Sequence, residues 1–197
     1  PYDTRIKVFI EKDDGMYDAI NRGLLKSNGD ILAYLNCDEQ YLPNALKTVD
    51  NFFSKHPEVE VVLAGTIVTD AKGNYMCHRP SIVPNLSTIW YRFPVFSSSV
   101  FFRRSVIERK KILFNYTWRD LGDIHWFISL LRNKINIKVL NYYTSIFTDR
   151  DDNMNLKPNA QLEKRKTTAR LVFSITKAGG WRGEVGFQLS GFHLRTL

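Results

Sequence analysis

The sequence predicts an α/β fold with a mixed, mostly parallel sheet between helices, and three observations support this prediction. Apolar runs of strand length alternate with amphipathic stretches of helical spacing through residues 1–150. The run at residues 31–35 is short and wholly apolar or aromatic, which is typical of a strand buried on both faces. Amide and carboxylate side chains follow it at residues 36–40, where open α/β sheets bind their ligands.

The first elements form a strand, helix and strand unit. A strand-like run at residues 6–10 precedes a polar turn, in which Asp13 or Asp14 is expected to cap the next helix. That helix shows one apolar stripe, made by Met16, Ala19, Ile20 and Leu24. The segment 28–30 ends the helix and leads into the strand at 31–35, so a right-handed crossover is expected.

The middle of the chain predicts a second helix and a hairpin. Pro43 is expected in the first turn of a helix over residues 43–54, which ends before Pro57. A β-rich run at 59–69, a turn at 70–74 and a returning strand at 75–78 follow. Residues 79–92 are expected to be irregular.

The second half predicts further alternation and then a change of character. A strand at 95–102, a short helix at 103–109, a strong helix at 121–132 and strands at 135–140 and 142–147 are expected. A basic helical stretch at 161–177 and an aromatic tail follow. We therefore divide the chain into a domain at 1–150 and a C-terminal segment at 151–197.

Composition limits the classes of protein that fit. The 197 residues suffice for one sizeable core, and no apolar run approaches the ~20 residues of a spanning helix. Cys37 and Cys77 make no disulfide framework, which suits a reducing cytoplasm. The aromatics of the tail fit packing on the domain, a partner, or peripheral contact with the inner face of a membrane.

The net charge of +8 favours anionic partners such as nucleotides or phospholipid head groups. The basic residues are scattered in small groups, and none of the common nucleic-acid-binding motifs is present. No nucleic-acid partner is therefore expected. A basic nucleic-acid binder remains an alternative, which steeply salt-dependent binding would support.

A long ordered series of polar positions resembles a known family. Residues 11–23 (EKDDGMYDAINRG), 29–31 (GDI) and 35–43 (LNCDEQYLP) resemble family 2 glycosyltransferases of the GT-A fold. The similarity covers roughly residues 1–150 in element order and is sharpest at 11–43. It implies a GT-A fold that lacks the first strands of its relatives, so the chain is expected to be a fragment that binds donor poorly alone.

The resemblance also implies an activity and its ligands. Members of the family transfer a sugar from a nucleotide-diphosphate donor to an acceptor hydroxyl, with inversion and a divalent cation, Mg²⁺ or Mn²⁺. Here that implies synthesis of a surface polysaccharide on a glycan or lipid-linked acceptor. Asp38 would face the donor ribose or the metal, Glu39 would bind the metal, and Asp14 and Asn21 would hold the nucleotide.

By the same resemblance, Asp123 is the candidate general base. It stands at the start of the helix at 121–132, although Gly122 replaces an acid found in relatives and His125 stands where many carry a second Asp. The alternative is that Asp123 only stabilises the helix N-terminus. Because Gln40 also replaces a third acid, a degenerate, non-catalytic glycosyltransferase-like binding module is the competing function.

Overall fold

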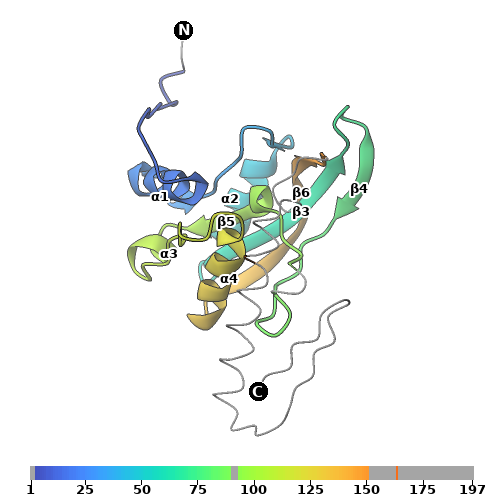
Figure 1. Ribbon diagram of the computed structural model, residues 1–197. Helices are drawn as coiled ribbons and strands as arrows, with labels where there is room; N and C mark the ends of the chain where they lie inside the picture. Colours follow the sequence, from blue (N-terminus) through green and yellow to red (C-terminus); the bar gives the residue numbers. More distant parts are fainter. Residues whose placement is uncertain (1–2, 90–92, 151–162, 164–197) are drawn as a thin grey trace, which may run out of the picture.

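The computed structural model describes residues 3–89, 93–150 and 163 (Figure 1). The predicted alternation of helices and strands is present. In chain order the elements are α1 (Met16–Lys26), β1 (Ile31–Leu32), β2 (Gln40–Tyr41), α2 (Ala45–Lys55), β3 (Val61–Thr69), β4 (Tyr75–Arg79), a 3₁₀ turn η1 (Ser97–Ser99), β5 (Val100–Arg103), α3 (Ser105–Glu108), α4 (Gly122–Arg132) and β6 (Ile137–Thr148).

The described strands form one mixed sheet in the order β1-β5-β3-β6-β2, with β4 paired to β3. β3 and β6 run parallel, and the remaining described pairs are antiparallel. The sheet is therefore mixed as predicted, but the expectation that it is mostly parallel is wrong. Antiparallel neighbours need no crossover helix. β5 can therefore pair with β3 after the loop and the η1 turn that follow β4.

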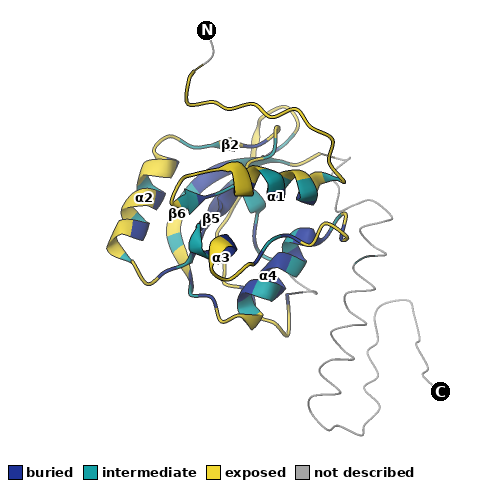
Figure 2. Cartoon of the chain, turned by 90° about the vertical axis from the view of Figure 1, so that its left-hand side faces the viewer, coloured by how far each residue is buried: buried dark blue, intermediate teal, exposed yellow. Residues whose placement is uncertain are grey.

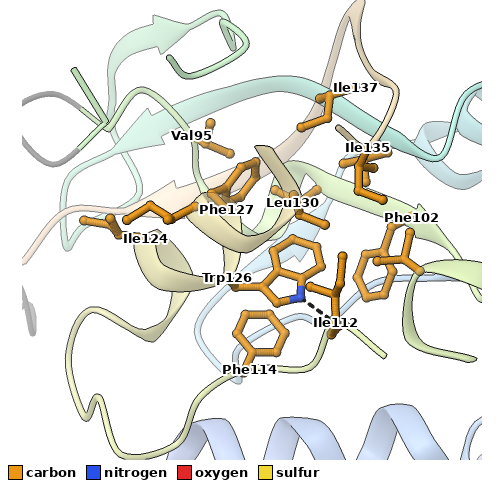
Figure 3. Close-up of a cluster of buried hydrophobic side chains, with 14 of the residues drawn as sticks. Val95, Phe102, Ile112, Phe114, Ile124, Trp126, Phe127, Leu130, Ile135 and Ile137 are labelled. Atoms are coloured by element: carbon orange, nitrogen blue, oxygen red, sulfur yellow. Dashed lines mark hydrogen bonds between the residues drawn. The ribbon is translucent and has the colours of Figure 1, made fainter. Parts of the chain in front are cut away.

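Two hydrophobic clusters cover the two faces of the sheet, and Figure 3 shows part of the larger one. Side chains alternate along each strand, so Leu63 and Phe102 join the cluster under α1, α3 and α4, whereas Val62 and Phe101 join the cluster under α2. Trp126 lies at the centre of the first cluster, and its indole N–H donates to the Ile112 carbonyl at 3.2 Å. This bond ties α4 to the segment that follows α3, and the Trp126 ring packs on Phe102 of β5.

The predicted strand at residues 31–35 is shorter and paired differently. Only Ile31 and Leu32 form β1, which is antiparallel to β5. Their side chains reach opposite clusters, so burial on both faces is confirmed while parallel pairing is not. The chain leaves the sheet at residues 33–35, and this departure brings Tyr34 towards the helices.

The predicted strand at residues 6–10 does not form. This stretch is extended, but it pairs with none of the described strands and leaves Ile6, Val8, Phe9 and Ile10 exposed (Figure 2). The expected crossover is consequently absent. A strand needs neighbours that satisfy its backbone groups, and residues 6–10 have no such neighbour in the described part of the chain.

The strands predicted at 135–140 and 142–147 are one continuous strand, β6. Its register against β3 shifts around Gly65, and this irregularity lets the strand continue. A Cβ at Gly65 would lie 2.5 Å from the ring of Tyr143, so only glycine fits there. The predicted strand at 95–102 divides instead into η1 and β5.

The helix ends differ in detail from the prediction. The N-cap of α1 is Gly15 at φ 115°, and Asp13 accepts the Gly15 N–H through its carboxylate at 2.9 Å. α2 begins at Ala45, after Asn44 in a left-handed conformation, rather than at Pro43. No helix among the described residues is long and apolar enough to cross a membrane. The helix predicted at 161–177 lies outside the described residues apart from Glu163.

Candidate functional site

Asp123 lies in the first turn of α4 and is partly buried. Its Oδ1 accepts the Ile124 N–H at 2.7 Å, and the Tyr17 hydroxyl donates to the carboxylate. Burial disfavours the charged form and raises the pKa of Asp123 to about 6, although these donors oppose the shift. The group can therefore exchange a proton near neutral pH.

Tyr17 reaches Asp123 from α1. Its side chain is only 3% exposed, and its ring stacks on Phe114 with centroids 5.5 Å apart. A Cβ at residue 122 would lie 2.5 Å from the Tyr17 ring, so Gly122 is what allows this close approach. Glycine at 122 thus has a packing reason in this chain, where the resemblance leads one to expect an acid.

Asn21, one turn after Tyr17, ties α1 to the segment before α4. Its amide Nδ2 donates to the Phe114 carbonyl at 2.8 Å, and its Oδ1 accepts the Phe114 N–H at 2.9 Å. The side chain is buried and both its polar atoms are occupied. Asn21 therefore has a structural role in this fold, and its predicted contact with the nucleotide stays a prediction.

Tyr34 lies between the two acidic regions of the site. Its hydroxyl is hydrogen-bonded to the Ser97 side chain, and its ring meets Phe114 edge-on at 5.5 Å. Burial raises the pKa of Tyr34 far above its ordinary value, and the charges of Asp123 and Glu39 both add to this effect. The two carboxylates therefore act on the same hydroxyl from different parts of the chain.

A small cavity of about 10 Å³ lies between Asp123, Tyr34 and Ser97, with apolar walls contributed by α4 and the segments around it. That volume accommodates about one water molecule. A larger hollow of about 220 Å³ lies beside α1, between Phe9, Arg22 and Lys26. None of the predicted site residues lines this second hollow.

Glu39 and Asp38 are neighbours in sequence with different surroundings. Glu39 is 8% exposed, and it accepts the Asn36 N–H at 3.0 Å and the Ser98 hydroxyl. Burial raises the pKa of Glu39, and the charge of Asp38 adds to the shift. Asp38 and Cys37 are exposed.

The hydrogen bonds of Glu39 continue into the sheet. Ser98 and Ser145 lie 3.1 Å apart through their hydroxyls, and Ser145 bonds in turn to Ser99 at 2.6 Å and to Thr66 at 3.2 Å. All four hydroxyl residues are buried. The loop that carries both acids is therefore anchored to a closed polar network at the irregularity of β3 and β6.

The acidic loop is suited to a cation that is bound partly by protein carboxylates and partly by a phosphate ligand, and not to one bound by protein side chains alone. Within residues 3–89 and 93–150, no group of three His, Cys, Asp or Glu side chains could hold a metal by itself. Asp38 nevertheless offers an exposed carboxylate beside the carboxylate of Glu39, and Mg²⁺ is commonly held by one or two carboxylates together with substrate phosphates. The donor set thus suits a cation that arrives with a phosphate ligand.

Asp14 lies in the turn before α1. Its carbonyl accepts the guanidinium of Arg119, and its N–H donates to Asp18 at 3.0 Å. The residue is exposed, so its carboxylate can meet a ligand. The Arg119 contact joins this turn to the segment before α4, which brings Asp14 to the same side of the molecule as Asp123.

The comparisons with known proteins identify the family. The sequence profile of glycosyl transferase family 2 matches residues 1–140. The chain belongs to this family. A search of curated protein sequences gives no significant match.

Solved structures agree with the family 2 assignment in fold. S. aureus TarS 1–349 in complex with UDP-GlcNAc superposes with a TM-score of 0.58 at 17% identity, over 82% of this chain and 48% of that one. S. aureus TarS 1–349 without that ligand gives a TM-score of 0.54 at 16% identity, over 91% and 58%. The family 2 chain described here therefore spans about half the length of these structures.

Sequence reasoning missed several groups of this family 2 site. Tyr34 was counted with the apolar or aromatic run of a strand, and Tyr17 appeared only within the motif at residues 11–23, with no role assigned to it. Glu163 was read as part of a basic helix. Its Oε1 accepts the Arg119 N–H at 2.7 Å, and its Oε2 accepts the N–H groups of Asp120 and Leu121 at 2.9 and 3.0 Å. No spacing rule connects a residue so distant to the start of α4.

Proposed function

We propose that this chain carries the catalytic centre of an inverting glycosyltransferase that uses a nucleotide-diphosphate sugar, with Asp123 as the general base. The observation that supports this most is the carboxyl of Asp123: partly buried, held by Tyr17 and the α4 backbone, with its pKa raised to about 6. Membership of glycosyl transferase family 2 and the TarS fold support the class of reaction.

In the proposed reaction, the ionised Asp123 accepts the proton of the acceptor hydroxyl. The acceptor oxygen then attacks the anomeric carbon of the sugar, and the bond from that carbon to the diphosphate oxygen breaks. Its electron pair leaves with the nucleoside diphosphate. One displacement with one base on the far side of the sugar gives inversion.

The acidic loop would receive the diphosphate end of the donor. A divalent cation, Mg²⁺ or Mn²⁺, would neutralise the charge that develops on the leaving diphosphate when bound there. Asp38 is the exposed carboxylate that would bind it, and Glu39 would hold the loop in shape while adding negative charge. Asp14 would contact the nucleotide end of the donor.

The donor and acceptor classes extend this proposal. TarS is solved with UDP-GlcNAc, and this supports a nucleotide-sugar donor for the protein described here. A glycan or lipid-linked acceptor and a role in cell-surface polysaccharide synthesis, at the inner face of the membrane, fit the same family. The residues of the predicted tail contact, 151–162 and 164–197, lie outside the described part of the chain.

The test compares Asp123→Asn with Asp50→Asn. Asp50 is exposed on α2, across the sheet from Asp123, so it provides the same chemical change away from the site. Loss of a general base should lower kcat about 100-fold or more, while donor binding measured by calorimetry is retained. Asp50→Asn should match the unmodified protein.

The pH profile provides a second readout. Transfer by the unmodified protein should fall as the pH drops below about 6, because protonated Asp123 cannot accept the acceptor proton. Transfer that survives in Asp123→Asn at the original rate would overturn the assignment of the base. Donor binding without transfer in any tested combination would favour the non-catalytic binding module.

A further inference from the structure

Three groups donate hydrogen bonds to the Asp123 carboxylate. They are the Tyr17 hydroxyl, the Ile124 N–H at 2.7 Å, and the N–H of Asp123 itself. The two backbone donors belong to α4 and fix the carboxylate to its own helix. Tyr17 is the one side chain among the three, and it comes from a different element, α1.

We propose that Tyr17 is a positioning residue, whose hydroxyl orients the Asp123 carboxylate so that a free oxygen lone pair faces the acceptor hydroxyl. This inference rests on the proposed function. A carboxylate offers about four acceptor positions, so three donors leave room for one substrate hydroxyl. The protein thus leaves a single direction open for proton transfer.

The packing around Tyr17 leaves its ring little freedom to move. One side stacks on Phe114, and Phe114 stacks in turn on Trp126 with centroids 4.9 Å apart. Gly122 meets the ring closely, since any Cβ there would lie 2.5 Å from it. The two hydrogen bonds between Asn21 and Phe114 then hold α1 itself in place. The hydroxyl therefore sits at a fixed position relative to α4.

The surroundings of Tyr17 keep its hydroxyl protonated, so that it acts as a hydrogen-bond donor. Burial, followed by the nearby charge of Asp123, raises the pKa of Tyr17 far above its ordinary value, so the hydroxyl keeps its proton at any working pH. Tyr34, which also acts on the site from the end of β1, is neutral for the same reason. Nearby on α4, the ring of His125 stacks on Trp118 at 3.8 Å.

The position of the Tyr17 ring also accounts for the glycine at position 122. The resemblance leads one to expect an acid before the base, and in this chain the Tyr17 ring fills the space that a side chain at 122 would enter. The neighbour of the base is then a neutral hydrogen-bond donor from another helix. It replaces a second negative charge, and a neutral donor favours the ionised form of Asp123 whereas a second charge would disfavour it.

The test is Tyr17→Phe, which removes the hydroxyl and keeps the ring and its stacking. We expect kcat to fall about 10- to 100-fold while the KM for the donor changes less than about twofold, because the change affects orientation of the base and not donor binding. Tyr116→Phe is the matched control, since Tyr116 is exposed in the loop before α4 and the same atom is removed.

A direct titration of the Asp123 carboxyl, by carbon NMR of the labelled protein, separates this proposal from the proposed function. In Tyr17→Phe the pKa of Asp123 should rise, because a donor to the ionised form is lost. The acid limb of the rate profile should move to higher pH with it. An unchanged pKa together with an unchanged kcat would overturn the role of Tyr17.

Failure of the two proposals can be distinguished. If the unmodified protein transfers no sugar from any tested donor, the proposed function fails, whatever the titration shows. If the unmodified protein transfers sugar and Asp123→Asn does not, but Tyr17→Phe equals the unmodified protein, the base stands and Tyr17 does not position it. Melting curves of both tyrosine variants confirm that the comparison is between folded proteins.

Discussion

The two acidic regions of the site are built in different ways. The loop between β1 and β2 holds Glu39 inside a network of backbone and serine hydroxyls and leaves Asp38 in solvent. The start of α4 instead holds Asp123 between a helix N-terminus and a tyrosine from α1. Burial raises the pKa of both Glu39 and Asp123, and under the proposed function only Asp123 accepts a proton from the acceptor hydroxyl.

The difference shows that sequence adjacency does not decide which residues share a role. Asp38 and Glu39 are neighbours, but Asp38 is exposed whereas Glu39 is buried and hydrogen-bonded to Asn36 and Ser98. Tyr17 and Asp123 are far apart in sequence and act as one unit. This comparison is tested by variants that replace Asp38 or Glu39 one at a time, and by variants that disturb the contact between Tyr17 and Asp123.

The largest effect should come from replacing Asp38 while Glu39 is kept. Asp38→Ala should lower cation-dependent transfer by about 100-fold or more, because it removes the proposed direct ligand, and loss of an outer-sphere partner alone costs about 10- to 100-fold. Its melting temperature should stay close to that of the unmodified protein, since Asp38 is exposed. Rate measurements over a range of Mn²⁺ concentrations and melting curves check both statements.

Glu39→Ala is the matched variant, and its main effect should be on stability, whereas that of Asp38→Ala should be on transfer. It leaves the Asn36 N–H and the Ser98 hydroxyl without their acceptor in a buried place, which costs about 1–3 kcal/mol of unfolding free energy. Chemical denaturation measures this loss. Equal stability of the two alanine variants would contradict the supporting role of Glu39.

A smaller effect is expected from Gly122→Ala. The added methyl group would lie 2.5 Å from the Tyr17 ring, so the ring or α4 must shift, at a cost of about 1–3 kcal/mol. Gly23→Ala is the control, because nothing lies within 4 Å of a Cβ at that position of α1. Alanine there should stabilise the protein by about 0.5–1 kcal/mol. Denaturation midpoints that move in the same direction would contradict the close contact between α1 and α4.

The smallest effect concerns the dependence of stability on pH. The folded-state pKa of Asp123 is about 6, above its ordinary value of 3.8. The folded protein therefore binds this proton more readily, and the stability contribution of Asp123 is lost as the pH rises through 6. Asp123→Asn should then be more stable than the unmodified protein by about 1–2 kcal/mol at pH 7.5, after allowance for partial exposure. The gain should vanish near pH 4, and melting curves at the two pH values check it.

Helices were predicted well because their signal is local. Both α1 and α4 were found within two residues of their expected ends. The buried face of α1 was predicted less well, because Met16 and Ala19 of the predicted stripe are exposed and the helix instead buries Tyr17, Asn21 and Leu24. The pairing of strands was predicted less well. The partner of β1 is β5, far along the chain, and no pattern within residues 31–35 distinguishes an antiparallel partner from a parallel one.

The same limit applied to the candidate site. Asp123 was found through the position of Gly122-Asp123 in a family pattern. The acids of the loop were found first from their place after a buried strand, and the family resemblance then suggested their roles. The side chains that donate hydrogen bonds to these acids and affect their pKa values, such as Tyr17 for Asp123 and Ser98 for Glu39, are distant in sequence. Asn21 contacts Phe114 across 93 residues, and no property of Asn21 visible in the sequence predicts this contact.

Glu163 has a practical consequence for protein production. Its carboxylate accepts three successive N–H groups just before α4, so the segment that carries Asp123 is capped by a residue 42 to 44 positions further along. A recombinant product that stops at residue 150, the boundary suggested by the sequence pattern, would lose this cap and leave those donors to water. Truncation series should therefore retain residue 163, and weak activity of a shorter product would not count against the proposed function.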